Sequence, residues 1–114
     1  MTIARALWLT ASHEAVTRDS TFHPDTGDVE IKTLFTGISR GTERLVYRGQ
    51  VPVSEHDNMR APFQEGAFTF PVKYGYAAVG EVQDGDRKGE TVFSLFPHQT
   101  SFAVPAAMAL PMTA

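Results

Sequence analysis

Alternation of apolar and polar residues is the clearest pattern in this sequence. From Val29 to Thr36 the two classes alternate over about six positions, which predicts a strand with one buried face. The segments 3–10 and 13–22 are rich in strand-forming residues, and we expect them to pair as an antiparallel hairpin. Further strands are predicted at 91–96 and 100–104. Short strands separated by turn residues are typical of an all-β sandwich or barrel.

Proline and glycine mark a corner in the segment 70–82. Pro71 restricts Val72 to the start or edge of a strand, because proline has no N–H to donate to a ladder. Gly75 and Gly80 permit a close approach of backbone that side chains would block. We therefore expect a buried hairpin corner with another part of the chain packed closely against it.

One short helix is predicted. Residues 43–48 can form one or two turns, with Thr42 as the N-cap and Gly49 as the C-terminal stop. The segment 50–69 carries isolated apolar residues without a sustained period and is expected to be a long surface loop. Loops of this length are usually functional or disordered, and the aromatic residues near its end indicate that it packs over another part of the domain.

The composition fits one globular domain. The chain has 114 residues, of which 42% are hydrophobic and 20% are charged, so it can bury a core without disulfides. The eight Phe, seven Pro and nine Gly favour strands and turns. The apolar residues of the predicted strands that we expect in the core are Leu7, Val29, Ile31, Phe35, Val79, Val82, Val92, Phe93 and Val104.

Cysteine content, charge and hydropathy exclude several classes of function. The absence of cysteine excludes disulfides, a thiolate zinc site and a cysteine nucleophile. The net charge is −3, and no clustered basic stretch could neutralise a phosphate backbone, so we expect no nucleic-acid partner. No segment approaches the roughly 18 apolar residues of a membrane span, and the N-terminal apolar run is too short for a secretion signal. We therefore expect a cytoplasmic protein without a membrane partner.

The four histidines do not form a local metal motif. His13, His23, His56 and His98 are too far apart in sequence to match the spacing of a zinc site, so we expect no metal. Most of them are expected to be solvated turn residues. His98, which lies between two predicted strands, is the one candidate for an acid or a base.

A polar turn follows the strand that ends at Thr36. Its glycines at 37 and 41 would let a ligand approach the backbone, although a solvated turn with a local ion pair would look the same. The segment also matches the pattern Gly-x-Ser-x-Gly around Ser39. A nucleophile elbow needs in addition a helix directly after the serine and a histidine and an acid placed to serve it. The sequence specifies neither partner, and a serine hydrolase stays an alternative.

Several motifs in order make the chain resemble a known family. They are Gly-Ile-Ser-x-Gly-Thr-Glu at 37–43, Pro-Val-x-x-Gly-Tyr-x-x-Val-Gly at 71–80 and Gly-Asp-Arg at 85–87. In this order they resemble the N-terminal GroES-like domain of the medium-chain dehydrogenase/reductase superfamily, which includes the zinc-type alcohol dehydrogenases. The resemblance covers about 3–110 and implies an all-β fold with minor α, a partly open antiparallel β-barrel, with 1–114 as a single domain.

The resemblance also implies a branch of the family without zinc ligands. Ser39, or Arg40 if the gap is placed differently, stands where the family has a cysteine ligand. Tyr76 replaces the family histidine and Ala77 replaces the glutamate. The cysteine-rich lobe that binds a structural zinc is missing as well. Since zinc needs thiolate, imidazole or carboxylate donors, these replacements would remove its Lewis-acid role.

The activity implied by the resemblance is that of the substrate-side domain of a zinc-independent NAD(P)-linked oxidoreductase. Its substrate would be an alcohol, a carbonyl compound or an activated alkene. NAD or NADP would be bound by a Rossmann domain that follows in such relatives and is absent here. We therefore expect that this domain alone binds neither cofactor and is inactive, and the cofactor-binding residues are unknown.

The resemblance assigns roles to residues of the polar turn. The family hydroxyl that relays a proton falls on Thr42, and Glu43 matches the acidic residue that orients the turn. Without a metal, Thr42, Tyr76 or Arg40 would have to polarise the substrate oxygen through hydrogen bonds. The residues expected to contact the substrate are Ser39, Glu43, Tyr47 and Tyr74.

A free-standing binding module on a GroES-like scaffold is the alternative to the enzyme. A reading frame that continues past Ala114 into a strand and Gly-x-Gly-x-x-Gly would favour the oxidoreductase, and a stop codon would favour the module. In the enzyme, the face left open by the missing domain would expose apolar residues and could support a homo-oligomer. The central loop and the tail would be disordered or packed on another molecule. The apolar residues expected on this face are Phe63, Phe68, Phe70 and those of 106–112.

Overall fold

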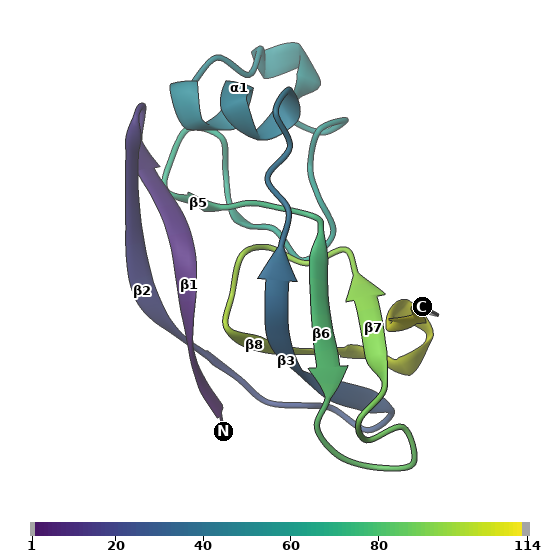
Figure 1. Cartoon of the computed structure of the whole chain (residues 1–114). Helices are drawn as coiled ribbons and strands as arrows, with labels where there is room; N and C mark the ends of the chain where they lie inside the picture. The colour runs from purple at the N-terminus through teal and green to yellow at the C-terminus, as the bar shows by residue number, and fades with distance from the viewer. Residues whose placement is uncertain (1, 113–114) are drawn as a thin grey trace.

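The structure, a computed structural model, describes residues 2–112 as two antiparallel β-sheets with one short helix at one end (Figure 1). The first sheet has the strand order β2-β1-β5-β4 and the second has the order β8-β3-β6-β7-β9. The strands of the first sheet are β1 (Thr2–Ala11), β2 (Glu14–Phe22), β4 (Glu65–Gly66) and β5 (Val72–Lys73). Those of the second are β3 (Asp28–Thr36), β6 (Ala78–Val82), β7 (Thr91–Ser94), β8 (Ser101–Pro105) and β9 (Leu110–Pro111).

The segment before β8 joins the two sheets. The amide of Leu7 in β1 donates a hydrogen bond of 2.9 Å to the carbonyl of His98, and the amide of Thr100 donates one of 2.9 Å to the carbonyl of Arg5. The carbonyl of Thr100 also accepts a hydrogen bond of 3.0 Å from the amide of Thr33 in β3. The sheets are thus linked on this side, and the predicted all-β fold, a partly open antiparallel barrel with minor helix, is confirmed.

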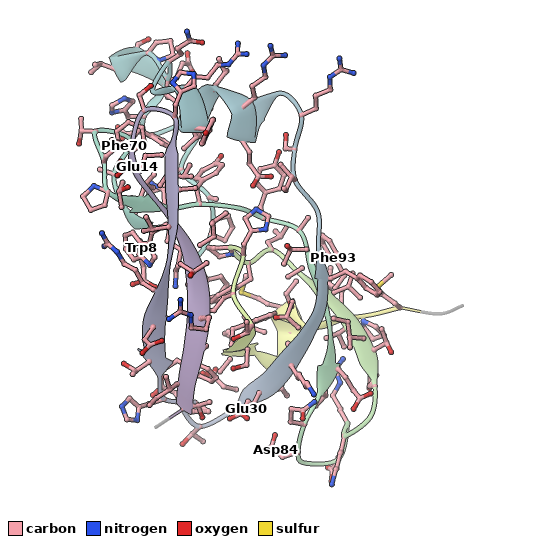
Figure 2. The ribbon with its side chains drawn as sticks, turned by 60° about the vertical axis from the view of Figure 1, so that its left-hand side comes forward. Trp8, Glu14, Glu30, Phe70, Asp84 and Phe93 are labelled. Atoms are coloured by element: carbon pink, nitrogen blue, oxygen red, sulfur yellow. The ribbon has the colours of Figure 1, made fainter. Side chains whose placement is uncertain are left out.

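The predicted hairpin at the N-terminus is confirmed. β1 and β2 pair antiparallel along their whole length, with Leu7 opposite Thr17 and Trp8 opposite Val16. The hairpin lies along one side of the second sheet (Figure 1), and Ala6 of β1 forms a bridge with Gln99 before β8. In Figure 2, Glu14 and Phe70 lie near the helical end of the molecule, whereas Glu30 and Asp84 lie at the opposite end.

The helix α1 (Thr42–Arg48) ends where the sequence predicts but begins differently. Gly49 adopts the left-handed conformation with φ 69° and closes the helix, as expected. The predicted N-cap Thr42 is wrong, because Gly41 holds that position and Thr42 is the first helical residue. The amide of Thr42 instead donates a hydrogen bond of 3.1 Å to Oγ of Ser39, so a residue outside the helix satisfies this free donor.

The loop 50–69 packs on the helix and contains buried residues. It holds the short 3₁₀ helix η1 (Val53–Glu55) and β4. Ala61 and Phe68 are buried in a cluster with Val46 of α1, so the expectation of an exposed Phe68 is wrong. Phe63 is exposed as expected, and Phe70 is half-buried. The loop covers the helix because its apolar side chains leave water when they enter this interface.

The tail also differs from the expected exposed segment. After β8 it forms the 3₁₀ helix η2 (Ala106–Met108) and then β9, which pairs with β7. Ala109 is buried in the cluster of the second sheet, while Leu110 and Met112 stay half exposed. The tail is therefore part of the sheet, and only some of its apolar residues face solvent.

The predicted core is confirmed for the central residues of the second sheet, whereas other predicted core residues are less buried. Ile31, Val82, Val92 and Val104 are fully buried. Phe96 and Phe102, which the sequence analysis missed, join this core and stack on each other with ring centroids 4.2 Å apart. The predicted core residues that are only partly buried are Leu7, Val29, Val79 and Phe93.

Phe35 was expected in the core, but its side chain is 72% exposed. The pairing of β3 with β6 shifts register between Thr33 and Phe35, so a bulge at Leu34 breaks the alternation. Such a one-residue slip moves the following side chains to the other face of the sheet. The alternation read from the sequence is therefore correct only up to the bulge.

The two glycines of the corner fit the predicted close approach. A Cβ atom added to Gly80 would lie 2.5 Å from the carbonyl oxygen of Lys32 in the neighbouring strand. One added to Gly75, which has φ +147°, would lie 3.0 Å from the ring of His98. The corner can pack this closely because neither position carries a side chain.

Within residues 2–112, no helix is both long enough and apolar enough to cross a bilayer.

Candidate functional site

A buried contact between the carboxylate of Glu43 and the imidazole of His98 lies at the centre of the candidate site. Glu43 stands in the first turn of α1, and His98 comes from the turn between β7 and β8. Their Oε1 and Nε2 atoms are 2.5 Å apart, and both side chains are about nine-tenths buried. Oε2 of Glu43 accepts a hydrogen bond of 2.5 Å from the amide of Ser39. The carboxylate thus connects the polar turn to the barrel.

The second ring nitrogen of His98 also has a hydrogen-bonding partner. Nδ1 of His98 lies 2.7 Å from Oγ1 of Thr36, at the end of β3. The ring also packs against the backbone at Gly75, where no side chain intervenes. The orientation of His98 is therefore fixed by contacts on three sides, from α1, β3 and the corner before β6.

A cavity of about 380 Å³ opens above this pair, between the β1–β2 hairpin and the polar turn. Its apolar wall comes from Leu7, Leu9, Ala15 and Ile38. Its polar lining comes from Ser39, Arg40, Glu43, Arg44, Tyr47, Tyr74 and His98. A mainly apolar cavity of this size with a few convergent polar groups has the character of a small-molecule site. We call it the hairpin cavity.

A second cavity of about 350 Å³ lies on the other side of Tyr74. It brings Thr42 and Tyr76 together, and the loop 50–69 forms one wall of it. The remaining lining residues are Asn58, Met59, Arg60, Ala61, Pro62 and Leu95. We call it the loop cavity.

The predicted site residues are divided between these two cavities. Ser39, Arg40, Glu43 and Tyr47 line the hairpin cavity, Thr42 and Tyr76 line the loop cavity, and Tyr74 lines both. Arg40 and Thr42 meet at an open hollow that Arg44 and Arg48 also line. The three residues expected to polarise a substrate are therefore not brought to one cavity.

Tyr74 separates the two cavities and is held firmly. Its hydroxyl donates a hydrogen bond of 2.7 Å to the carbonyl of Met59, and its ring packs edge-on against Phe68 and Tyr76. Burial raises the pKa of Tyr74 to about 12, and the charges of Tyr76 and Glu43 add to the effect. Tyr74 therefore keeps its proton at a pH above 10.0, the ordinary pKa of a tyrosine. By contrast, Tyr76 is only half-buried, and its side chain lines the loop cavity.

The geometry does not support a serine nucleophile. Oγ of Ser39 accepts the amide hydrogen of Thr42, and its backbone N–H is bound by Glu43. Both ring nitrogens of His98 are bound to Glu43 and Thr36, so this histidine does not serve Ser39. A triad needs a histidine bound to the nucleophile and oriented by an acid. Here Glu43 and His98 contact each other, but the side chain of Ser39 binds the backbone amide of Thr42 and not the histidine.

The residues at the family's metal position do not fit zinc. Among the described residues no three His, Asp or Glu side chains converge on one point. The side chains of Glu43 and His98 are bound to each other rather than directed at a common centre. A zinc site needs at least three such protein donors.

The sequence identifies His98 as a candidate acid or base but does not show that Glu43 is its partner. Its position between two strands marked it as a candidate acid or base, and this was the only available signal. Its partner Glu43 is distant in sequence, and only the folded barrel brings the 97–99 turn to the start of α1.

Comparisons with known proteins agree with the fold. No family model matches the chain. The 2-desacetyl-2-hydroxyethyl bacteriochlorophyllide A dehydrogenase of Cereibacter sphaeroides is 37% identical over 75 residues, which are 61% of this chain and 20% of that protein. A double mutant of Etr1p superposes with a TM-score of 0.68 at 17% identity, over 98% of this chain and 34% of that one.

The quinone oxidoreductase of Thermus thermophilus superposes with a TM-score of 0.59 at 17% identity, over 96% of this chain and 32% of that one. The chain thus spans about a fifth of the curated relative and about a third of the solved chains. The expected resemblance to the N-terminal GroES-like domain of the medium-chain dehydrogenase/reductase superfamily is confirmed.

Proposed function

We propose that this chain is the substrate-side domain of a zinc-independent NAD(P)-linked oxidoreductase that acts on an alcohol, a carbonyl compound or an activated alkene. The matched curated relative is named a dehydrogenase, and the matched Thermus protein is a quinone oxidoreductase that was solved with NADPH. The observation that carries the proposal is the loop cavity, where Thr42 and Tyr76 meet. The resemblance assigns these two positions to the relay hydroxyl and to a former metal ligand.

Hydrogen bonds from the protein would replace the metal in this cavity. Tyr76 lines this cavity, and a tyrosine hydroxyl can donate a hydrogen bond to a substrate oxygen. Thr42 is held in place by the hydrogen bond from its amide to Ser39, which fixes the start of the helix beside the cavity. Donors aimed at an oxygen that gains negative charge lower the barrier most when they are already in position. The residues present thus favour polarisation by hydroxyl groups.

The nicotinamide cofactor, when bound, would supply or accept the hydride. This chain contains no Gly-x-Gly-x-x-Gly segment to hold the cofactor diphosphate. We infer that a Rossmann domain is its partner, that 1–114 acts as a single substrate-side domain and that this domain alone is inactive. Hydride transfer needs both reactants held against each other, and this chain has residues for the substrate only. A cytoplasmic location stays a prediction.

The proposal is tested on the full-length product of the gene. We expect oxidation of NADH or NADPH with at least one member of a panel of quinones, enals and aldehydes, at a rate that a chelator does not change. Tyr76→Phe and Thr42→Val should each lower kcat/KM about 10²-fold, since each removes one donor to the developing charge. Thr26→Val, in an exposed turn that lines neither cavity, is the matched control and should leave the rate unchanged.

The isolated domain gives a second test. Calorimetric titration of the 114-residue chain with NADH and with NADPH should show no binding. Micromolar affinity for either cofactor would contradict the proposal that a separate domain binds the cofactor. A full-length protein that turns over no member of the panel would favour the binding module instead.

A further inference from the structure

The Glu43–His98 pair has no role in the proposed chemistry, because neither residue lines the loop cavity. We propose that His98 is a positioning residue that holds Glu43 and, through it, fixes the turn 39–42 that presents Thr42. The effect on catalysis rests on the proposed function, whereas the coupling between His98 and the turn is a property of this chain alone.

A continuous series of hydrogen bonds connects His98 to the turn 39–42. Oγ1 of Thr36 lies 2.7 Å from Nδ1 of His98, and Nε2 lies 2.5 Å from Oε1 of Glu43. Oε2 of Glu43 accepts the amide hydrogen of Ser39 at 2.5 Å, and Oγ of Ser39 accepts the amide hydrogen of Thr42 at 3.1 Å. The series therefore runs from the end of β3 to the first residue of α1 without a gap.

The chemistry of these groups sets the direction of the hydrogen bonds. An ionised carboxylate only accepts hydrogen bonds, so Nε2 of His98 carries the proton that faces Glu43. Hydrogen bonds to a charged group are about twice as strong as neutral ones, and burial strengthens them further. Glu43 is 9% exposed, so without His98 one carboxylate oxygen would be buried without this partner.

The surroundings of the ring prevent it from moving with the turn. The main chain at Gly75 lies so close that a Cβ atom there would be 3.0 Å from Nε2 and Cδ2 of His98. The backbone of His98 is itself fixed, because its carbonyl accepts the amide hydrogen of Leu7 in β1. The imidazole is thus an anchor on the rigid barrel, and the turn is the part that depends on it.

Neither partner belongs to the hydrophobic clusters of the domain. The cluster of the second sheet is centred on Ile31 and Phe102, and that under the loop is centred on Val46 and Val72. Loss of the imidazole should therefore loosen the turn 39–42 more than it unfolds the sheets. A purely structural role would instead lower the protection of all elements together.

The first experiment measures amide hydrogen exchange by NMR in the 114-residue chain. His98→Ala should accelerate exchange of the Ser39 and Thr42 amides, while the amides of β3 and β6 keep their protection. His98→Gln should restore much of the protection, because its side-chain amide can still donate to a carboxylate. His23→Ala, at an exposed histidine, is the matched control. It should change the exchange of neither the Ser39 and Thr42 amides nor the amides of β3 and β6.

The second experiment uses the full-length protein. His98→Ala should lower kcat about 10²-fold with a smaller change in KM, because displacement of a catalytic hydroxyl by about 1 Å costs this much. Unchanged exchange at Ser39 in His98→Ala, or an equal loss of protection in every strand, would overturn the inference. A full-length protein without oxidoreductase activity would refute the proposed function and leave the exchange result as the test of the coupling.

Discussion

The ammonium group of Lys73 donates a hydrogen bond of 2.6 Å to Oε1 of Gln99, and Lys73 is only 1% exposed. It also forms an ion pair with Glu65 of β4 and lies 5.5 Å from the ring centroid of Phe96. A buried charge is tolerated only when its partners are in place. This contact ties β5 to the turn that carries His98, and so helps to hold the histidine against Glu43.

Removal of either partner of this contact should destabilise the domain. Gln99→Leu leaves a buried ammonium without its neutral partner, and Lys73→Met leaves the Gln99 oxygen unsatisfied. Each change should lower the free energy of unfolding by about 1–3 kcal/mol in urea titrations. In the double variant the free energy of unfolding should fall by less than the sum of the two single losses, because neither the ammonium of Lys73 nor the Gln99 oxygen is left unpaired. Lys32→Met, at an exposed position, is the control; additive losses in the double variant would contradict the coupling.

Gly80 should not tolerate even a methyl group. An added Cβ atom would meet the carbonyl oxygen of Lys32 at 2.5 Å as well as the side chain of Ile31, and both belong to the rigid strand β3. Gly80→Ala should therefore lower the free energy of unfolding by about 1–3 kcal/mol or more. Gly41→Ala is the matched control, since nothing lies within 4 Å of its added Cβ, and as a change at the helix N-cap it should alter stability by about 1 kcal/mol or less. Equal effects of the two substitutions would refute the proposed close packing.

Local patterns in the sequence predict the strands and the close-packed glycines well. Alternation is a property of neighbouring residues, so the strand beginning near Val29 could be found without the fold. The bulge at Leu34 could not, because a bulge is defined by the pairing of β3 with β6 and not by β3 alone. The exposed position of Phe35 follows from that pairing and was therefore missed.

The candidate site is predictable only in part for a similar reason. The residues of one turn, such as Ser39 and Glu43, are neighbours in sequence, and the motif places them together. Their partner His98 and the barrier formed by Tyr74 come from other segments, and their contacts depend on how the barrel closes. The sequence contains candidate groups for these contacts but no signal for which of them meet.

The exposure of Phe35 leads to a direct test of the fold. Phe35→Ala should change the free energy of unfolding by about 0.5 kcal/mol or less, because its side chain is mostly in water. Phe102→Ala, which empties a fully buried position stacked on Phe96, should cost about 3–5 kcal/mol. Urea unfolding of both variants gives the comparison. A large decrease in the free energy of unfolding for Phe35→Ala in the isolated chain would mean that β3 has no bulge at this position.

The same residue tests self-association through a face other than the one expected at Phe63 and 106–112. Phe35, Leu34 and Ile38 are exposed apolar side chains at the end of β3 and in the polar turn. If they mediate self-association, Phe35→Ala should shift sedimentation velocity profiles of the isolated chain toward the monomer at high concentration. Val53→Ala, at an 82% exposed apolar residue in the loop, is the control for a general loss of apolar surface. A wild-type chain that is monomeric at all concentrations would refute this oligomer.

The pKa of Tyr74 predicts how stability changes at high pH. The folded state holds this proton up to a pKa of about 12, whereas the ordinary pKa of a tyrosine is 10.0. Between these two values the unfolded chain releases the proton and the folded chain keeps it, so stability must fall as the pH rises through this window. The loss attributable to Tyr74 should reach about 1 kcal/mol at pH about 11, which lies roughly one pH unit above the pKa of the unfolded chain.

Tyr74→Phe separates this effect from the loss of a hydrogen bond. At pH about 8 the variant lacks the bond to the carbonyl of Met59, and it should be less stable than the wild type by about 0.5–1.5 kcal/mol. At pH about 11 ionisation of this hydroxyl favours the unfolded wild type, whereas the variant has no hydroxyl to ionise. The stability difference should therefore shrink or change sign between the two pH values in urea titrations. An equal difference at both would mean that Tyr74 ionises as readily in the folded chain as in the unfolded one, and that burial between the two cavities does not hold its proton.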